Sequence, residues 1–283
     1  YVTATSVPVV IVPRSLPHRM PVLMWGVYSS EGFEREIGRL KQIGFTHVLG
    51  LGADFGRIWD AGSPTQPEKP ENIATRKRML NEALAQGLSI CASLSPGSWA
   101  RSKKEFLRVD RQGKVYESRP DICGLFPELR RFCYNVGVSM AQTYGGFPAF
   151  DSALIHTEVR DSANPCFHEH DRAAFRQFAG FDVPEQVGGK SGVRYDSLEG
   201  FPESRVLPDD YPLYVYYRWY WKHGDGWNEL NTAVHEGLKT SGRSDLWTFH
   251  DPAVRVASVY GSGGAVDVLS QWTYSYPDPI RIA

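Results

Sequence analysis

The sequence lacks three features that would assign it to a large class of proteins. It contains no apolar run of about 18 residues, so a membrane-spanning helix is not expected. Its 31 Lys and Arg nearly balance its 32 Asp and Glu, for a net charge of −1. It has no Cys-x-x-Cys pair of the kind that binds zinc. We therefore expect no membrane partner and no broad surface for nucleic acid.

The chain also lacks an initiator Met and a signal-peptide pattern at Tyr1. It is therefore expected to be processed or cut from a longer protein. Its few cysteines fit buried thiols or an occasional disulfide. They are Cys91, Cys123, Cys133 and Cys166. Cys166 stands just before His168-Glu-His-Asp171, and this group resembles a metal cluster. The irregular sequence around it favours a solvated charged loop instead, so neither a metal nor a cofactor is predicted.

Aromatic residues, in contrast, are abundant. They make up 13% of the chain, with eight Trp and fourteen Tyr, and apolar residues make up 42%. This composition and the length of 283 residues are typical of one large α/β domain or two smaller ones. Most of the rings are expected in the core, and a few could offer flat faces on which sugars stack.

Apolar strands alternate with amphipathic helices along most of the chain. Phe33, Ile37, Leu40 and Ile43 recur every three or four residues, which is the period of a helix. Apolar segments indicate strands at 22–28, 46–51, 88–94, 151–157, 246–250 and 266–270. Helices are indicated at 31–43, 73–85, 127–144, 171–178 and 211–238. A polar, Pro-rich loop is expected after the second strand, and a hairpin at 110–113.

Short apolar strands that alternate with helices indicate a parallel sheet covered by helices. Six such units are three quarters of a (β/α)8 TIM-type barrel, which sequence outside this chain is expected to complete. A doubly wound open sheet is the main alternative, but no Gly-rich phosphate loop follows the first strand. We predict a linker or the tail of a preceding β-segment at 1–20. The incomplete barrel domain follows at 21–283, with insertions at about 95–126 and 162–208.

Catalytic residues are expected where the strands end, because barrel enzymes place their active sites at the carboxyl ends of the strands. The apolar run Ala153-Leu-Ile155 leads directly into His156, Glu158 and Arg160. Glu158 is the candidate proton donor, because partial burial can keep a carboxyl group protonated near neutral pH. Polar and aromatic side chains follow the other strands too, and they suit sugar hydroxyls and ring faces. The candidate substrate contacts are Trp25, Tyr28, Asp54, Trp99, His156, Arg160, Asp251, Trp272 and Tyr274.

Structural interpretations compete at several of these positions. Glu158 could form a structural ion pair with Arg160. His156 is as compatible with a hydrogen-bonded core position as with a sugar contact. Asp251 stands before a proline, and this pair often starts a turn. For Trp272, core packing competes closely with sugar stacking.

The order of the units and two short motifs resemble a known family. Val266-Asp-Val-Leu-Ser-Gln-Trp-Thr-Tyr-Ser-Tyr-Pro277 resembles the sixth-strand pattern of retaining (β/α)8 glycoside hydrolases, most of all the family 42 β-galactosidases. Arg172-Ala-Ala-Phe-Arg-Gln-Phe178 resembles a segment found after their fourth strand. The resemblance spans roughly residues 21–280. It implies hydrolysis of O-glycosidic bonds with retention, with Glu158 as the general acid/base.

Two features depart from that family's pattern. Its members usually carry Asn directly before the acid/base Glu, where this chain has Thr157. Their nucleophile is a Glu after the seventh strand, and only six strands are indicated here. The resemblance therefore places the nucleophile beyond this sequence. It also implies an oligosaccharide or polysaccharide substrate, for which a secreted or periplasmic protein and a homo-oligomer are the corresponding expectations.

Two other functions compete with a glycoside hydrolase. A non-catalytic carbohydrate-binding protein on a degenerate barrel would explain the absence of a seventh-strand carboxylate. A metal-dependent barrel enzyme would need ligands at several strand ends, and only His156 and His250 qualify. The sequence favours the hydrolase.

Overall fold

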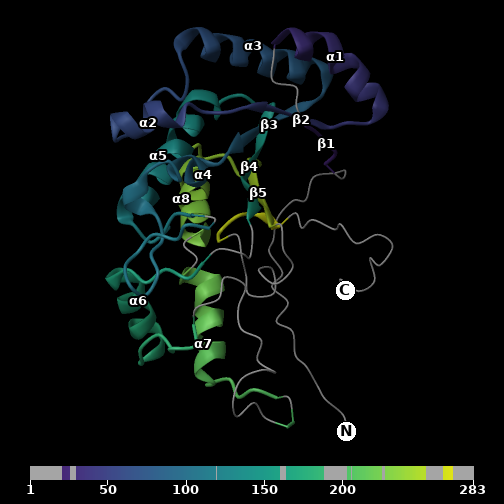
Figure 1. The fold of residues 1–283 in the computed structure, drawn as a ribbon. Coiled ribbons are helices and arrows are strands. Elements are labelled where there is room, and N and C mark those ends of the chain that lie inside the picture. The colour runs from purple at the N-terminus through teal and green to yellow at the C-terminus, as the bar shows by residue number, and fades with distance from the viewer. Residues whose placement is uncertain are drawn as a thin grey trace.

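A computed structural model describes residues 21–25, 30–118, 120–159, 164–187, 203–204, 206–224, 227–252 and 264–269 (Figure 1). The strands are β1 (Leu23–Met24), β2 (His47–Leu51), β3 (Ser89–Leu94), β4 (Phe150–Val159), β5 (Trp247–Pro252) and β6 (Val268–Leu269). The longer helices are α1 (Ser30–Ile43), α3 (Pro70–Gln86), α5 (Pro127–Tyr144), α6 (Glu169–Ala179) and α8 (Trp227–Lys239). The shorter ones are α2 (Phe55–Ala61), α4 (Pro96–Ala100), η1 (Lys104–Phe106), α7 (Pro212–Trp219) and η3 (Tyr220–Gly224).

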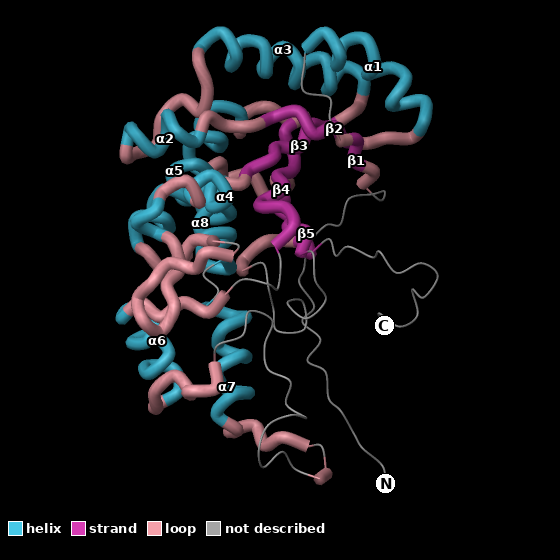
Figure 2. Tube along the Cα trace, viewed as in Figure 1, coloured by secondary structure: helices cyan, strands magenta, loops and turns pink. Residues whose placement is uncertain are grey.

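The six strands form one parallel sheet whose spatial order follows the chain order, β1 to β6. A doubly wound sheet reverses its strand order near the middle, so this topology rules that alternative out for the described strands. The alternation of strands and helices predicted from the sequence is confirmed. The described chain is a half-barrel of the TIM-like α/β type, with helices packed along the strands (Figure 2).

The sheet has two differently packed faces, because successive side chains of a strand point to opposite sides. One face joins the large core that the helices cover. Its strand residues are Val48, Leu51, Ile90, Ala92, Leu94, Ala153 and Ile155. The other face carries a separate small cluster of Leu49, Cys91, Leu154 and Phe249. This second cluster is the inner layer of the half-barrel.

One loop prediction needs correction and another is confirmed. The polar segment after β2 contains the helix α2, which was expected to be a loop. Asp54 caps this helix by accepting a hydrogen bond from the Arg57 N–H at 3.1 Å, and Gly62 ends it with a left-handed φ of 64°. The helix has only seven residues, too few for a clear apolar period. The predicted hairpin is confirmed, because Val109 bridges Val115 in an antiparallel sense.

The helical region predicted at 211–238 is not one helix. It comprises α7, the π-helical turn η3 and α8. Within α7, Leu213 and Tyr217 are buried. They belong to a second hydrophobic core that also includes Phe175 of α6 and Tyr216 of α7. The segment after β4 therefore has its own packing, separate from the core of the barrel.

Helices α5 and α8 cross at a pair of glycines. A Cβ on Gly137 would lie 2.3 Å from the carbonyl oxygen of Val234. A Cβ on Gly237 would lie 2.3 Å from the carbonyl oxygen of Tyr134. No side chain fits at these distances, so the two backbones touch. Each helix leads into a strand, α5 into β4 and α8 into β5, so the crossing fixes how these strands enter the sheet.

Asp267 attaches β6 to the rest of the sheet. Its carboxylate accepts hydrogen bonds from the Lys239 ammonium at 3.0 Å and from the Thr248 N–H at 2.9 Å. Its own N–H donates to the carbonyl oxygen of Thr248. Although partial burial opposes its ionisation, Lys239 and the Thr248 N–H hold the pKa of Asp267 below its usual range.

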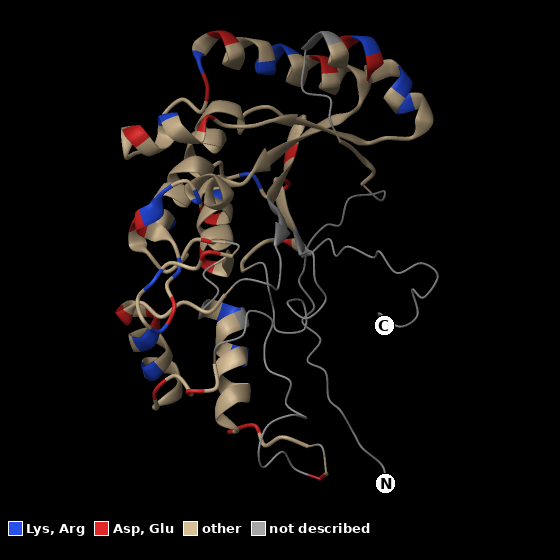
Figure 3. Cartoon of the chain, viewed as in Figure 1, with Lys and Arg blue, Asp and Glu red and all other residues tan. Residues whose placement is uncertain are grey.

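Charges of both signs lie along the outer helices α1 and α3 (Figure 3). None of the helices that the structure describes is both long and apolar enough to cross a lipid bilayer.

Replacing Gly137 with Ala should lower the free energy of unfolding by about 3 kcal/mol, the upper end of the usual cost of overpacking, because the clash is with backbone atoms. Urea unfolding measures the change. Gly38→Ala is the matched control, because no atom lies within 4 Å of a Cβ built there. That change in α1 should stabilise the protein by roughly 0.5–1 kcal/mol. Equal effects of the two variants would contradict the close crossing.

Asp267→Asn should destabilise the protein by about 1–3 kcal/mol near neutral pH, because the Lys239 ammonium loses a charged partner. Because the pKa of Asp267 is lowered in the folded state, its ionisation stabilises the protein at pH values above the unfolded-state pKa of about 3.9. That contribution is lost as the pH falls through the lower folded-state pKa. The difference between wild type and variant should therefore shrink in acid. Thermal unfolding between neutral and acid pH tests this, with the exposed Asp60→Asn as control.

Candidate functional site

The carboxyl ends of β4 and β5 bring two predicted site residues onto neighbouring strands. Thr157 of β4 pairs with Asp251 of β5, and Val159 pairs with Pro252. Glu158 lies between these two pairs, on the longest strand of the sheet. The structure describes the backbone of His156, Glu158 and Asp251 but not their side chains. Because barrels place their active sites at the carboxyl ends of the strands, this edge of the sheet is the candidate active site.

The other predicted contacts divide into two groups. Trp25 follows β1 and is 52% exposed. Asp54 and Trp99 are described with their side chains. Tyr28, Arg160, Trp272 and Tyr274 lie outside the described residues. Their roles as substrate contacts stay predictions.

Asp54 has a structural role as the cap of α2. It also lines an open cavity of about 460 Å³ at the carboxyl end of β2. Glu68, Lys69 and Glu71 line the same cavity from the start of α3. Glu68 is held in place, because it accepts a hydrogen bond from the Tyr144 hydroxyl at 3.0 Å. The cavity is polar and open, which is compatible with a hydroxyl-rich ligand.

Trp99 packs into an aromatic cluster. Its ring centroid lies 5.9 Å from that of Trp59 and 5.3 Å from that of Phe132. The Lys103 ammonium lies 5.2 Å from the centroids of both Trp rings. Trp99 therefore packs against other side chains over much of its surface. Such packing was the interpretation expected for most aromatic residues.

His250 lies on the face of β5 opposite Phe249, because adjacent strand residues point to opposite sides. It is fully buried, and its Nδ1 lies 3.3 Å from the carbonyl oxygen of Ile155. His250 is therefore a core residue and not a ligand at the strand end.

The expectation of a solvated loop around Cys166 is wrong. Cys166 and Asp171 are buried, and together with Cys123 and His168 they form a compact cluster. One donor atom from each of the four lies within 4.8 Å of the others. Cys123 comes from the loop before α5, Cys166 and His168 belong to the segment that leads into α6, and Asp171 lies in the first turn of α6.

The contacts within this cluster, which we call the thiol cluster, are close. The Cys166 Sγ lies 3.0 Å from His168 Nδ1, and the Cys123 Sγ lies 3.3 Å from Asp171 Oδ2. His168 Nδ1 lies 3.6 Å from Asp171 Oδ2. At its rim, His170 Nε2 lies 3.1 Å from the same Asp171 oxygen and 3.2 Å from the Cys123 Sγ.

Charge in the thiol cluster favours a thiolate at Cys166 but not at Cys123, whose pKa is raised by its hydrogen bond with Cys166 and by burial. Although burial opposes ionisation, hydrogen bonds with Cys123 and His168 lower the pKa of Cys166. Hydrogen bonds with Asp171 and Cys166 raise the pKa of His168 to about 9. Burial also opposes the ionisation of Asp171, but its bonds with His168 and His170 hold its pKa below the usual range. A thiolate is the form in which cysteine binds metals.

The donor set fits a tetrahedral Zn²⁺. Zinc takes cysteine sulfur at about 2.3 Å and histidine nitrogen at about 2.0 Å, which separates neighbouring ligands by roughly 3.3–3.8 Å. The distances of 3.3 Å from Cys123 to Asp171 and 3.6 Å from His168 to Asp171 are of this size, the distance of 3.0 Å from Cys166 to His168 is shorter, and all four donor atoms lie within 4.8 Å of one another. Two thiols, an imidazole and a carboxylate are all zinc ligands, and four protein ligands in a buried place are typical of a structural rather than a catalytic site. Cys123, Cys166, His168 and Asp171 could therefore hold a zinc ion.

The sequence carried only part of the signal for this cluster. The spacing Cys166-x-His168-x-x-Asp171 was visible, but Cys123 lies 48 residues before Asp171. Only the folded chain brings the fourth donor to the other three.

Comparisons with known proteins find the fold but not a family. No protein-family model matches the sequence, and no curated protein matches it significantly. The β-galactosidase of the psychrophilic Marinomonas ef1 is similar in structure, with a TM-score of 0.56 and 16% identity over 90% of this chain and 41% of that chain. The β-galactosidase of Rahnella sp. R3 gives 0.54 and 14%, over 92% and 41%. That of Bacillus circulans sp. alkalophilus gives 0.54 and 12%, over 91% and 40%.

These similarities establish a shared scaffold. Identities of 12–16% show a common fold and leave the individual residues to be argued from this chain alone. The chain spans about 40% of the length of these enzymes. The TIM-like α/β fold predicted from the sequence is therefore supported for the described strands, and the complete barrel stays a prediction.

We expect the purified protein to bind one Zn²⁺ per chain at the thiol cluster, which elemental analysis after dialysis measures. Cys166→Ser and His168→Ala should each weaken zinc binding by at least about 100-fold, since removing a ligand exceeds the effect of outer-shell changes. Zinc should also raise the melting temperature of the metal-free protein. Cys91→Ala removes a buried thiol outside the cluster and should keep the metal. Equal metal content in all variants would contradict this assignment.

Proposed function

We propose that this chain belongs to a glycoside hydrolase that cleaves O-glycosidic bonds of oligo- or polysaccharides, with Glu158 as the general acid/base. The observation that carries the proposal is the register at the end of β4. Glu158 stands at the carboxyl end of a consecutive parallel sheet, next to the pair formed by Thr157 and Asp251. The scaffold similarity to three β-galactosidases supports the class of reaction and makes β-galactosides the first substrates to test.

The proposed chemistry assigns two successive tasks to Glu158. In the retaining form of the reaction, it donates its proton as a carboxylic acid to the glycosidic oxygen while the bond from that oxygen to the sugar carbon breaks and the second carboxylate bonds to that carbon. As a carboxylate it then accepts a proton from the water molecule that completes hydrolysis. The proton that Glu158 gives to the leaving group is therefore restored by water, and the enzyme returns to its starting state.

A retaining mechanism requires a second carboxylate as nucleophile, about 5–5.5 Å from the acid/base. The proposal places it after a seventh strand, in sequence beyond this chain. In an inverting mechanism the second carboxylate would act as a base at roughly 6.5–9.5 Å. Asp251 is the candidate partner in that case, because its strand lies beside that of Glu158.

The proposal includes a secreted or periplasmic protein, since polymeric carbohydrate is met outside the cytoplasm. The candidate contacts for the sugar are the exposed Trp25, Asp54 in its polar cavity, and Asp251. The alternative is a non-catalytic carbohydrate-binding protein on the same scaffold, which would bind oligosaccharides and hydrolyse none of them.

Replacing Glu158 with Gln in the full natural protein should lower turnover of glycosides with poor leaving groups by about 10²–10⁴-fold, because no proton reaches the leaving oxygen. Glycosides with activated aryl leaving groups need little protonation and should be affected much less in the bond-breaking step. A series of aryl and alkyl β-galactosides measures this difference.

Glu185→Gln is the matched control, because Glu185 is an exposed carboxylate outside the strands. It should leave all rates unchanged. If Glu158→Gln leaves the alkyl glycosides unaffected, Glu158 is not the acid. If the natural protein binds oligosaccharides and hydrolyses none of them, the carbohydrate-binding alternative is correct.

A further inference from the structure

Two of the four thiols of the chain meet in the thiol cluster. All four cysteines lie within the described residues and are buried. Cys91 belongs to the small cluster on the inner face of the sheet, and Cys133 belongs to the large core under the helices. The sulfur atoms of Cys123 and Cys166, in contrast, are among the donor atoms that lie within 4.8 Å of one another. These two cysteines are therefore the natural partners for a disulfide.

The protein itself holds the two thiols close together. The buried Arg108 side chain donates one hydrogen bond to the carbonyl oxygen of Ile122 at 2.8 Å and another to that of Asn164 at 3.0 Å. Ile122 directly precedes Cys123, and Asn164 stands two residues before Cys166. One guanidinium group thus fixes the two thiol-bearing segments side by side, through bonds that involve no metal.

The side chains of both cysteines have room to change their geometry. A disulfide brings its two sulfur atoms to about 2.05 Å. Neither Cys123 nor Cys166 lies in a helix or a strand. A change between staggered rotamers moves each sulfur without moving the backbone. The remaining approach, from a separation of no more than 4.8 Å, is of the size that rotation of the two side chains supplies.

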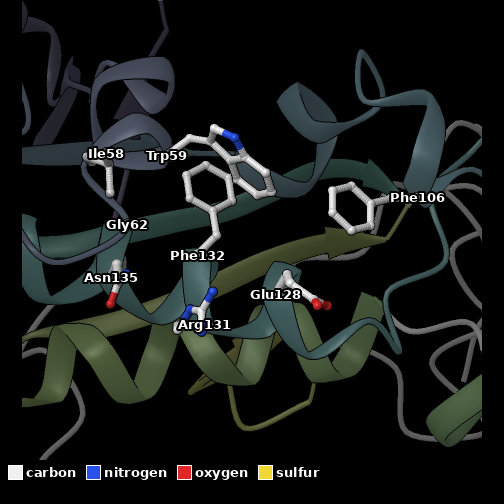
Figure 4. A pocket seen from close by; sticks show the side chains of 8 residues that line it. All are labelled: Ile58, Trp59, Gly62, Phe106, Glu128, Arg131, Phe132 and Asn135. Carbon is white, nitrogen blue, oxygen red and sulfur yellow. The ribbon is translucent and has the colours of Figure 1, made fainter.

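Aromatic and imidazole rings decide which reagents reach the sulfur atoms. The Phe126 ring packs 5.2 Å from that of His168 and 4.7 Å from that of His170. Phe106 packs behind Phe126 at 5.0 Å, and it also borders the small pocket between α2 and α5 (Figure 4). The side chains of His168 and His170 are 23% and 38% exposed, so they form the side of the cluster that faces water. A small oxidant can pass there, whereas a bulky one cannot.

The same two sulfur atoms are zinc ligands in one state of the cluster and disulfide partners in the other. A metal binds cysteine as the thiolate, and a sulfur atom in a disulfide is no longer a thiolate. A disulfide would leave only His168 and Asp171 of the four ligands. Because a structural zinc ion requires four protein ligands, the metal-bound cluster and the cross-linked cluster exclude each other.

We propose that Cys123 and Cys166 are a site of reversible oxidation, at which a disulfide replaces the bound metal. The disulfide cross-links the loop before α5 to the segment that leads into α6. Its oxidant is hydrogen peroxide, which is small enough to pass the imidazoles. The proposal needs no carbohydrate and no hydrolysis, so it holds or fails independently of Glu158.

The oxidation takes place in two steps. Cys166, which is 5% exposed against 1% for Cys123, reacts first. Its sulfur attacks a peroxide oxygen, the O–O bond breaks, and a sulfenic acid and a water molecule form. Cys123 then attacks the sulfenic sulfur, the S–O bond breaks, the S–S bond forms, and a second water molecule leaves. In total the two thiols lose two electrons and two protons, and one peroxide takes them up as water.

Peptide mapping of the full natural protein tests the proposal, because trypsin separates all four cysteines. Cys91, Cys123, Cys133 and Cys166 fall in the peptides 79–101, 115–130, 132–160 and 161–172. After equimolar hydrogen peroxide is added to the metal-free protein, peptides 115–130 and 161–172 should be found linked. Their joint mass should be lower by two hydrogen atoms than the sum of the separate peptides. A phosphine reductant should separate them again.

Zinc should compete with the cross-link. Protein that is loaded with zinc before the peroxide is added should form the disulfide severalfold more slowly than metal-free protein. Each disulfide that forms should release one zinc ion, which a colorimetric zinc indicator measures. Reduction followed by added zinc should restore the metal-bound state.

Two variants isolate the pair. Cys166→Ser should abolish the link to peptide 115–130. Cys133→Ala is the matched control, because it removes the buried thiol nearest to Cys123 in the sequence but outside the thiol cluster. It should keep the link between peptides 115–130 and 161–172. If Cys166→Ser fails to fold, the map of the wild-type protein decides the question.

Four results would overturn the proposal. One is the absence of any cross-link after peroxide, and another is a link from peptide 115–130 to peptide 132–160 instead. A third is a sulfinic acid on Cys166 without a cross-link, which would show that Cys123 cannot reach it. The fourth is a cross-link that forms equally fast with and without zinc.

Discussion

The close crossing of α5 and α8 is the constraint on which the candidate active site depends. Gly137 and Gly237 let the two helix backbones touch, and each helix leads directly into a strand. Those strands, β4 and β5, pair along most of their length and carry Glu158 and Asp251 to adjacent places. A side chain at either glycine would force the helices apart, and the register at the strand ends would shift with them.

The segment after β4 is attached to the barrel by polar groups as well as by its own apolar core. The fully buried Arg108 donates to the carbonyl oxygens of Ile122 and Asn164 and to the Tyr220 hydroxyl. It thus joins the segment before α5 to the chain on both sides of α6. The thiol cluster makes a second connection between the same two parts. A metal ion there would replace several weak contacts by one set of strong bonds.

At the strand ends, the scaffold presents the proposed acid/base for chemistry, as barrels with many activities do.

The sequence alone determined the succession of strands and helices, since the periods of apolar residues are local and need no knowledge of the fold. It also determined that Glu158 would stand at the end of β4, because the apolar run before it is a strand in any packing. It did not determine α2, whose seven residues depend on the Asp54 cap more than on an apolar period.

Only the tertiary structure decided which distant residues meet. Cys123 joins Asp171 across 48 residues of chain, and no spacing rule predicts such a contact. Local patterns specify each element, whereas contacts between elements depend on how all of them pack at once. For this reason the position of Glu158 at the end of β4 could be inferred from the sequence, and the thiol cluster could not.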